Sequence, residues 1–452
     1  MRLSAVFHAL RDAPAQDLHL AAGTALTFGI RMLSYVLTAA TGIVVARALG
    51  AHGRGVYALA VTIAYLFPSL ASLGVSWAGV YFVGHKRCSL QEMISNNLVF
   101  WLSVSCLWIT GVIVFALVRP ESILPEFRFS YFLILAVGGA ILLLSAFAKD
   151  ISIASGSVLG YNAVDLSDSV FRTILIASGV LVLGLGVGGV LSAWLLAICF
   201  TGVLGACLIA KRGRLKLAGN LSLFKKQLTF GLRGYLGYVL QTANYRLDVF
   251  FVAAFAGSST LGQYTVAFGT AEMLWQLPMT LGEVLYPKLS ALDSEANTDT
   301  AVATCRRVLF ITLIGLLLAL ASGRFLIGFL YGSEYLPAVN VFYILVPSVL
   351  LYTIHKVLGS SLSGNGMPEV NLYGGGASVL VTIGLDLLLI PRMGMEGAAI
   401  ASVAAYAVNA GVILSVFLYV TRRSPLEILL VRRSDILDSF QLARAFLARG
   451  QA

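Results

Sequence analysis

Two arginines, Arg31 and Arg233, end nearly identical hexapeptides, LTFGIR (26–31) and LTFGLR (228–233). Each lies several residues inside an apolar stretch, where a charged side chain is costly and usually faces a cavity or a partner. A guanidinium fork binds phosphate oxygens bidentately, so two arginines on opposite walls of one cavity would suit a diphosphate. The alternative is that both side chains snorkel to the cytoplasmic head groups. We predict the first arrangement, a two-arginine diphosphate site.

A polar stripe follows in the same apolar stretch as Arg233. Arg246 and Asp248 are two residues apart, about 200° around a helix, so they are not expected to pair directly. Asp248 shares a broad helix face with Gln241 and Tyr245, which predicts a polar surface toward a cavity. We assign Asp248 to ion coupling or sugar contact. The secondary cavity residues that we predict are Arg47, Arg246, Gln241 and Tyr245.

The next apolar stretch carries two carboxylates close to one helical line. Glu272, Gln276, Met279 and Glu283 have the spacing i, i+4, i+7 and i+11. Two carboxylates on one helix face could take up protons or sodium, or bind a sugar. For Glu283 the alternative is a simple ion pair with Lys288. We predict that Glu272 and Glu283 serve ion coupling or sugar contact.

Five further ionisable residues lie in or beside apolar stretches. His355 is expected to be hydrogen-bonded within the helix bundle rather than part of a proton relay. Asp386 is expected to form a structural ion pair with Lys356. Asp165 and Asp168 either line the cytoplasmic entrance of a cavity or cap a helix.

The composition defines the solvent in which these residues act. Hydrophobic residues make up 58% of the chain and charged residues 12%, and the mean hydropathy is +0.89. A soluble chain is roughly 45–50% apolar and about 25% charged. These values exclude a soluble enzyme, a secreted disulfide scaffold and a disordered protein. They predict an all-α polytopic membrane protein.

Several kinds of chemistry have no sequence support. The five cysteines are scattered without CxxC spacing, which argues against a metal site or a disulfide framework. The chain contains no GxxxxGK[ST] motif, so we expect no ATPase activity and no bound cofactor. The net charge of +10 sits beside apolar spans, which indicates anionic membrane lipids as partners rather than nucleic acid. We therefore expect a proton or sodium gradient to drive any transport.

A span needs about 20 apolar residues, and on that scale we predict twelve. Between the sixth and seventh spans lies a basic connector, residues 211–226. It separates two bundles of six helices, residues 22–210 and 227–420, which follow an N-terminal segment, 1–21. The predicted spans are about 22–49, 55–84, 97–118, 129–149, 166–186, 188–210, 227–256, 261–287, 305–323, 338–360, 368–390 and 395–420.

The distribution of Lys and Arg predicts the orientation. With both termini in the cytoplasm, 20 of the 31 Lys and Arg fall in cytoplasmic segments and 5 in outside loops, as the positive-inside rule requires. The outside loops are too short for a catalytic domain. The basic tail, 421–452, is either an interfacial amphipathic helix or a loosely ordered segment that enforces topology.

The two halves are related by an internal repeat. Besides the two hexapeptides, GVYALA (55–60) recurs as GQYTVA (262–267), and Pro68 has a counterpart in Pro278. Six spans per half is an even number, so both copies enter the membrane from the same side. Parallel repeats of this kind enclose a central cavity and rock around it, which favours an alternating-access transporter over a channel.

At this point the chain resembles a known family, the multidrug/oligosaccharidyl-lipid/polysaccharide exporter superfamily. The segment ARALGAHGRGVYALA (46–60) looks like its first-loop pattern. Three later segments are similar to its polysaccharide-biosynthesis branch. They are YRLDVFFVAAFAGSSTLGQYTVAFGTAEMLWQLPMTLGEVLYPKLS (245–290), FLYGSEYLPAVNVFYILVPS (329–348) and LDLLLIPRMGMEGAAIASVAAY (385–406).

This resemblance implies a V-shaped pair of bundles around a central cavity and a flippase activity. Members of the branch move undecaprenyl-diphosphate-linked oligosaccharides from the cytoplasmic to the outer leaflet, generally driven by an ion gradient. We therefore predict a non-enzymatic flippase or antiporter of a bacterial inner membrane that serves polysaccharide export, alongside a polymerase or other export machinery. The alternatives are a cation-coupled exporter of small organic molecules and a lipid-II flippase, although the latter usually carries fourteen spans.

Overall fold

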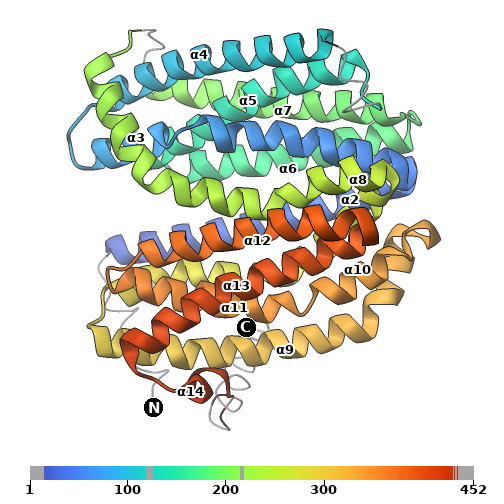
Figure 1. The fold of residues 1–452 in the computed structure, drawn as a ribbon. Coiled ribbons are helices and arrows are strands. Elements are labelled where there is room, and N and C mark those ends of the chain that lie inside the picture. Colours follow the sequence, from blue (N-terminus) through green and yellow to red (C-terminus); the bar gives the residue numbers. More distant parts are fainter. Residues whose placement is uncertain (1–14, 119–125, 214–217, 431, 433–434, 436–452) are drawn as a thin grey trace. The chain divides into compact units, whose positions relative to one another are not determined.

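The computed structural model describes residues 15–118, 126–213, 218–430, 432 and 435, and the side chains of Arg233 and Glu283 lie outside it. Helices account for nearly all of the described residues (Figure 1). The chain forms two compact units. Unit 1 contains Met1–Ala48 and Ile63–Tyr235, and unit 2 contains Leu49–Thr62 and Leu236–Ala452.

Unit 1 is built around α5, which packs against its helical neighbours α3, α4, α6 and α7. The largest side chains buried in it include Trp194, Phe147 and Met93. Ser157 begins α6 by accepting a hydrogen bond from the Gly160 amide at 3.1 Å, as expected of an N-cap serine. The helices are α2 (Ala15–Ala71, shared with unit 2), α3 (Val75–Gly84), α4 (Leu90–Leu117), α5 (Phe129–Ala154), α6 (Val158–Leu181), α7 (Val187–Arg212) and the start of α8 (Leu221–Ser290).

Unit 2 contains the rest of α8 and a bundle in which α13 packs on α10, α11 and α12, while α11 also packs on α9. Asp293 caps α9 by accepting from the Ala296 amide at 2.8 Å. The remaining helices are α9 (Ser294–Tyr331), the short 3₁₀ helix Ser333–Tyr335, α10 (Ala338–Leu345), α11 (Ser348–Gly364), α12 (Glu369–Met393), α13 (Met395–Thr421) and α14 (Pro425–Leu429).

The two longest helices, α2 and α8, are each interrupted by one glycine with positive φ. Gly50 has φ 64° and Gly257 has φ 79°, backbone conformations that glycine adopts without steric cost. Within unit 2, the turn after each kink packs against the other. A Cβ added to Gly55 would overlap the carbonyl oxygen of Ser258, and one added to Gly262 would overlap that of Ala51. Only glycine allows two helix backbones to come this close.

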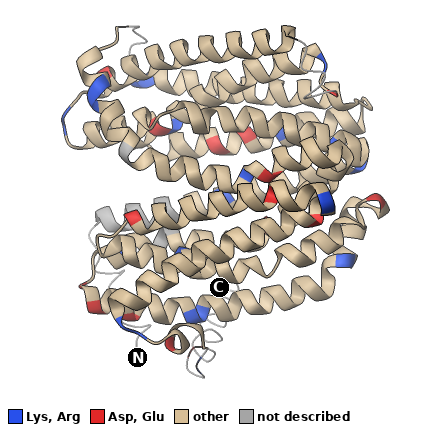
Figure 2. Ribbon diagram, in the orientation of Figure 1, with Lys and Arg blue, Asp and Glu red and all other residues tan. Residues whose placement is uncertain are grey.

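Nine described helical segments are long and apolar enough to cross a membrane, and charged residues are sparse along them (Figure 2). The structure is therefore an all-α multi-pass membrane protein. This number is three below the twelve predicted spans. Helices α2 and α8 each hold parts of two predicted spans but count as one segment, and α6, which holds the fifth predicted span, is too polar to count. The fifth predicted span, 166–186, begins too late, since Ser157 starts α6 at Val158. Helix α8 likewise begins at Leu221, inside the segment predicted as connector.

The first part of the C-terminal tail is docked on α9 rather than loosely ordered. Ile428 of α14 is fully buried in an apolar cluster that includes Cys305 of α9. Asp435 accepts a hydrogen bond from Arg306 Nε at 2.8 Å, and Arg306 Nη1 donates to the Glu427 carbonyl oxygen at 2.8 Å. The remainder of the predicted amphipathic helix lies outside the described residues.

Candidate functional site

The most distinctive polar site is a buried set of oxygen-bearing side chains between α8, α12 and α13 of unit 2. Asp248 and Asn244 are one helical turn apart on α8, and Asp386 and Thr382 are one turn apart on α12. Thr382 Oγ1 donates to Asn244 Oδ1 at 2.9 Å, which joins the two helices. We call these four residues and Ser402 of α13 the carboxylate cluster. Each member is less than 9% exposed.

Asp248 is held from three sides. Its Oδ1 accepts from the Val249 amide at 2.9 Å, and its Oδ2 accepts from the Tyr264 hydroxyl and, at 3.5 Å, from Ser402 Oγ. Asp248 therefore occupies a buried socket, where the sequence predicts a residue on an open polar stripe. Gln241 and Tyr245 contact one another instead, through a hydrogen bond of 3.4 Å.

Asp386 is fully buried, and neither of its carboxyl oxygens has a hydrogen-bond partner among the described residues. The predicted ion pair with Lys356 is wrong, since neither Asp386 oxygen has a described partner and Lys356 Nζ instead lies 5.5 Å from the centre of the Tyr352 ring. Asp386 is instead close enough to Asp248 to interact with it electrostatically. Two carboxylates that interact in a low-dielectric interior cannot both stay ionised without a proton or a cation to compensate them.

The only basic group near these carboxylates that the described contacts identify is Arg246. It also interacts electrostatically with Asp248, but its ion pair is with Glu272, at 3.8 Å. Both side chains of that pair are about two-fifths exposed (42% and 39%). Asp248 and Glu272 therefore share one guanidinium group, and no described basic group interacts with Asp386. With both aspartates ionised, the site would carry a surplus of negative charge that a proton or a cation would neutralise.

An aromatic group packs beside this site. The Tyr245 ring centre lies 6.2 to 6.5 Å from those of Tyr406, Tyr352 and Trp275, and the Trp275 and Tyr352 rings stack at 5.5 Å. Buried His355 also contacts Tyr352, at 6.0 Å between ring centres. Its Nδ1 has no hydrogen-bond partner within the described part of the chain, contrary to the expectation for this nitrogen.

The other predicted site residues are less fully defined. Arg31 is half-buried and Arg47 exposed, both on α2. The side chains of Arg233 and Glu283 lie outside the described residues. Arg31 lies 19 residues before the Gly50 kink and Arg233 lies 24 residues before the Gly257 kink. At about 1.5 Å per helical residue, their backbones differ in depth by about 7.5 Å, and the diphosphate clamp remains a prediction.

Unit 1 contains a second charged network, on α6. Asp165 pairs with Lys149 at 3.2 Å, and Asp168 accepts from the Tyr65 hydroxyl at 3.2 Å. Arg172 bridges this network to α2, because it lies 3.6 Å from Asp168 and donates to Tyr65 Oη at 3.1 Å and to Thr38 Oγ1 at 2.9 Å. The capping alternative for the two aspartates is wrong, since Ser157 is the N-cap and both lie inside the helix.

Sequence reasoning missed the neutral members of the carboxylate cluster and also Arg172. The missed signal was helical spacing: Asn244 and Asp248, and Thr382 and Asp386, are both i, i+4 pairs within apolar helices. Such pairs place polar oxygens on one helix face. Their pairing across two helices 138 residues apart in sequence is tertiary information that spacing alone does not contain.

Solved structures with a similar fold cover nearly the whole chain. An inward-closed lipid II flippase MurJ superposes with a TM-score of 0.71 at 16% identity, over 93% of this chain and 92% of the other. An inward-facing MATE family transporter of the MOP superfamily superposes with 0.66 at 17% identity, over 89% and 99%. The chain therefore has the same fold as these two membrane proteins.

Sequence comparison then defines the family. A family model described as polysaccharide biosynthesis protein matches residues 20–293, more than half of the chain. The chain therefore belongs to the polysaccharide biosynthesis protein family, as the sequence predicts. It is 24% identical over 170 residues to a probable low-salt glycan biosynthesis flippase, Agl15, of Haloferax volcanii. It is 27% identical over 199 residues to an uncharacterized membrane protein of Methanocaldococcus jannaschii. These matches span 35% and 39% of the two relatives.

Proposed function

We propose that the protein is a cation-coupled flippase that moves a lipid-linked glycan across a membrane for polysaccharide export. The coupling of transport to a cation is proposed from the carboxylate cluster. In this cluster Asp386 has no hydrogen-bond partner among the described residues and interacts with Asp248. Family membership and the similarity to a glycan biosynthesis flippase support the substrate class.

The proposed architecture has twelve spans in two six-helix bundles, V-shaped around a central cavity and related by a parallel repeat. The equivalent kinks at Gly50 and Gly257 support the repeat, since they are 207 residues apart, as are GVYALA and GQYTVA. Rocking of the bundles would expose the cavity to one side and then the other. In the proposed topology both termini are cytoplasmic and the membrane is a bacterial inner membrane.

Coupling follows from the electrostatics of the cluster. A proton or Na⁺ that binds between Asp248 and Asp386 would remove their repulsion and favour the conformation in which the cluster is closed. Asn244, Thr382 and Ser402 supply neutral oxygens, and hard cations prefer a set of oxygens of this kind. Release of the cation would restore the repulsion and favour the other conformation.

The proposed substrate is a glycan attached to undecaprenyl diphosphate. Arg31 and Arg233 would bind its diphosphate from different depths, while Arg47, Gln241, Tyr245 and the Arg246–Glu272 pair would line the sugar path. Glu283 is proposed as a further sugar contact. A polymerase or other export machinery would receive the flipped product.

The test is transport in liposomes with a fluorescent lipid-linked oligosaccharide, an outside quencher and an imposed Na⁺ or proton gradient. Asp248→Asn and Asp386→Asn should each abolish the dependence of flipping on the gradient. Glu396→Gln, which removes a half-buried carboxylate of α13 outside the carboxylate cluster, should not. Arg31→Gln and Arg233→Gln should reduce flipping at every gradient. Full gradient dependence in both aspartate variants would disprove coupling at the cluster.

A second candidate function is export of small organic cations. The observation that favours it is the aromatic group around Tyr245 beside Glu272, because aromatic faces and a carboxylate suit such cations. A deletion strain that becomes sensitive to cationic drugs but keeps normal surface glycan would support this candidate and contradict the flippase.

A further inference from the structure

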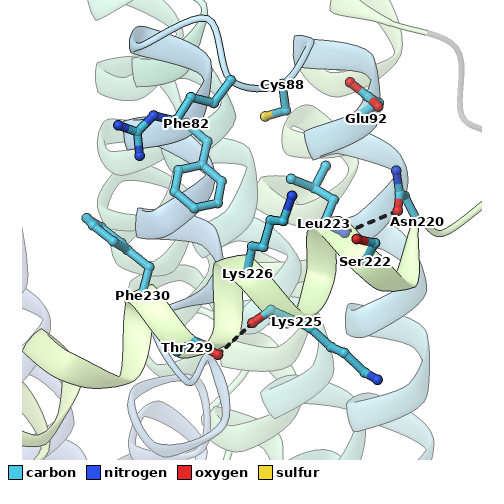
Figure 3. Close-up of a pocket in the computed structure, with 11 residues that line it drawn as sticks. Phe82, Cys88, Glu92, Asn220, Ser222, Leu223, Lys225, Lys226, Thr229 and Phe230 are labelled. Carbon is cyan, nitrogen blue, oxygen red and sulfur yellow. Dashed lines mark hydrogen bonds between the residues drawn. The ribbon is translucent and has the colours of Figure 1, made fainter.

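Unit 1 contains a pocket of about 770 Å³ outside the sites described above. It lies where the end of α3 and the start of α4 meet the first turns of α8 (Figure 3). We call it the Lys226 pocket. Its lining residues are Phe82, Arg87, Cys88, Glu92, Asn220, Ser222, Leu223, Lys225, Lys226, Thr229 and Phe230.

The charge of the pocket is positive. Three of its lining residues are basic, and its one carboxylate, Glu92, is occupied by hydrogen bonds from Ser89 N–H and Ser89 Oγ–H, both at 2.9 Å. Lys226 extends toward the space between Phe82 and Cys88, whereas Lys225 extends along the other side of α8 (Figure 3). No described carboxylate lies within 4.0 Å of Lys226, so its ammonium group is available to an anion.

The opposite wall is aromatic. Phe230 stacks on Tyr81 with ring centres 4.5 Å apart and lies 5.6 Å from Phe82. Phe230 is 39% exposed, so an apolar surface remains uncovered beside the cations. A molecule with an anionic head and an apolar chain would satisfy both walls at once.

Buried amides fix the two helices that form the pocket. Asn96 of α4 accepts from the Asn220 amide at 2.7 Å and donates to Gln227 Oε1 at 3.1 Å. Asn220 Oδ1 in turn accepts from the Leu223 amide at 3.1 Å and so caps α8. Asn96 and Gln227 are almost fully buried. The first turns of α8 are thus held rigidly against α4, which reduces the entropic cost of binding at the pocket.

We propose that the Lys226 pocket binds the diphosphate head of a polyprenyl lipid, as a loading site used before the central cavity. This proposal rests on the proposed flippase function and specifies where its substrate first docks. In the predicted topology, Arg87 and Lys226 both lie in cytoplasmic segments, at the leaflet where a lipid-linked glycan is made. The hydroxyl and amide groups of Ser222, Thr229 and Asn220 provide contacts for the first sugar.

A diphosphate fits the charge better than an ordinary anionic phospholipid does. Its phosphates carry more negative charge than the single phosphodiester of phosphatidylglycerol, and both Lys226 and Arg87 line the pocket. The aromatic wall would contact the first isoprene units. Neither inorganic diphosphate nor an uncharged polyprenol would use both walls, so each should bind more weakly than the complete lipid.

Cys88 provides a direct reporter, because its half-buried thiol lines the pocket. The experiment uses the full chain in nanodiscs of uncharged lipid, with Cys106, Cys199, Cys207 and Cys305 replaced by Ala. The rate at which N-ethylmaleimide labels Cys88 is measured alone and with farnesyl diphosphate, farnesol, inorganic diphosphate or phosphatidylglycerol. Farnesyl diphosphate should slow labelling about tenfold or more at saturation, and Lys226→Gln should raise the concentration needed about tenfold.

The matched control is Lys288→Gln, which removes an exposed lysine of unit 2 and should leave protection unchanged. Equal protection by phosphatidylglycerol would overturn the diphosphate assignment in favour of a general lipid site. No protection by farnesyl diphosphate, or protection that Lys226→Gln does not weaken, would overturn the proposal. Flipping is measured on the same protein. Flipping without protection of Cys88 would refute only the proposed binding site in the Lys226 pocket. Specific protection without flipping would support the diphosphate site and refute the proposed flippase function.

Discussion

The buried ion pair between Arg306 and Asp435 yields the most quantitative prediction. The Arg306 and Asp435 side chains are 9% and 3% exposed, and their atoms approach to 2.8 Å. Removing one partner of such a pair leaves a buried charge without compensation and costs about 3–5 kcal/mol. We expect Asp435→Asn to fall near the lower value, about 3 kcal/mol, because the hydrogen bond from Arg306 to the Glu427 carbonyl oxygen remains.

Cys305 makes this cost measurable in the folded protein. It is fully buried in the same apolar cluster as Ile428 of the docked tail, so a maleimide should reach it only when the tail opens. With Cys305 as the only cysteine, a loss of about 3 kcal/mol predicts labelling about 100-fold faster in Asp435→Asn. The control is Asp299→Asn, which breaks an exposed ion pair with Arg423 and should change the rate less than about fivefold.

The pH dependence gives the same prediction an independent check. Burial alone would raise the pKa of Asp435, but hydrogen bonds from Arg306 and the Arg432 amide outweigh it and hold the pKa below its ordinary value. A lowered folded-state pKa stabilises docking above the unfolded value of about 3.9, and this contribution is lost as the pH falls through the folded value. Normalised to the unfolded protein at each pH, Cys305 labelling should be flat from neutral to mildly acidic pH and rise only below about pH 4. Labelling that is unchanged in Asp435→Asn would refute the reasoning.

Three further predictions concern the helices and the two charged networks. Gly262→Ala should prevent stable folding, because its Cβ would overlap the Ala51 carbonyl. The control Gly269→Ala has open space at its Cβ and should leave the free energy of thermal unfolding unchanged or raise it by up to about 1 kcal/mol. Asp386→Asn should stabilise the cation-free protein by about 1–3 kcal/mol and abolish any rise in melting temperature with Na⁺; a preserved Na⁺ effect would contradict the cluster. Arg172→Gln should slow flipping while protein yield stays normal, and unaltered flipping would exclude Arg172 from the transport path.

Composition and periodicity were sufficient to predict most of the fold. Apolar stretches and helical spacing predict an all-α membrane protein, and most residues of the predicted spans are helical, although residues 72–74 and 182–186 are not. The predicted ends of the spans were wrong where a polar capping residue sets the end of the helix. Helix α6 starts directly after its Ser157 cap, eight residues before the predicted span, because hydropathy does not detect hydrogen-bonded caps. The continuous course of α2 and α8 through Gly50 and Gly257 was also missed, since a glycine marks a kink and a loop equally well in sequence.

The candidate site was predicted only in part. Asp248 and Glu272 were singled out because charges are rare in apolar helices, and that signal is visible in one dimension. Whether a charge is paired depends on which helices meet. The predicted partner of Asp386 was therefore wrong, since Asp386 interacts with Asp248 rather than Lys356, and the Arg246–Glu272 pair was not predicted. The only sequence signal for neutral partners such as Asn244 is their i, i+4 spacing from an aspartate, which does not say which helix they meet.

Under the proposed repeat, equivalent helix interfaces in the two units contain different charged residues. Counting from the two kinks, Thr41 of α2 is equivalent to Asp248 of α8, and both helices pack on the fifth helix of their bundle. In unit 1, Thr41 bonds to Thr173 at 2.9 Å, beside Arg172; in unit 2, Asp248 lies by Asp386. Under this repeat, the interface in unit 1 holds Arg172 paired with Asp168, whereas the equivalent interface in unit 2 holds Asp248 and Asp386. A cation bound in unit 2 would then act on the helix pair equivalent to the one that Arg172 joins in unit 1, which is a direct physical route for coupling an ion gradient to movement of the helices.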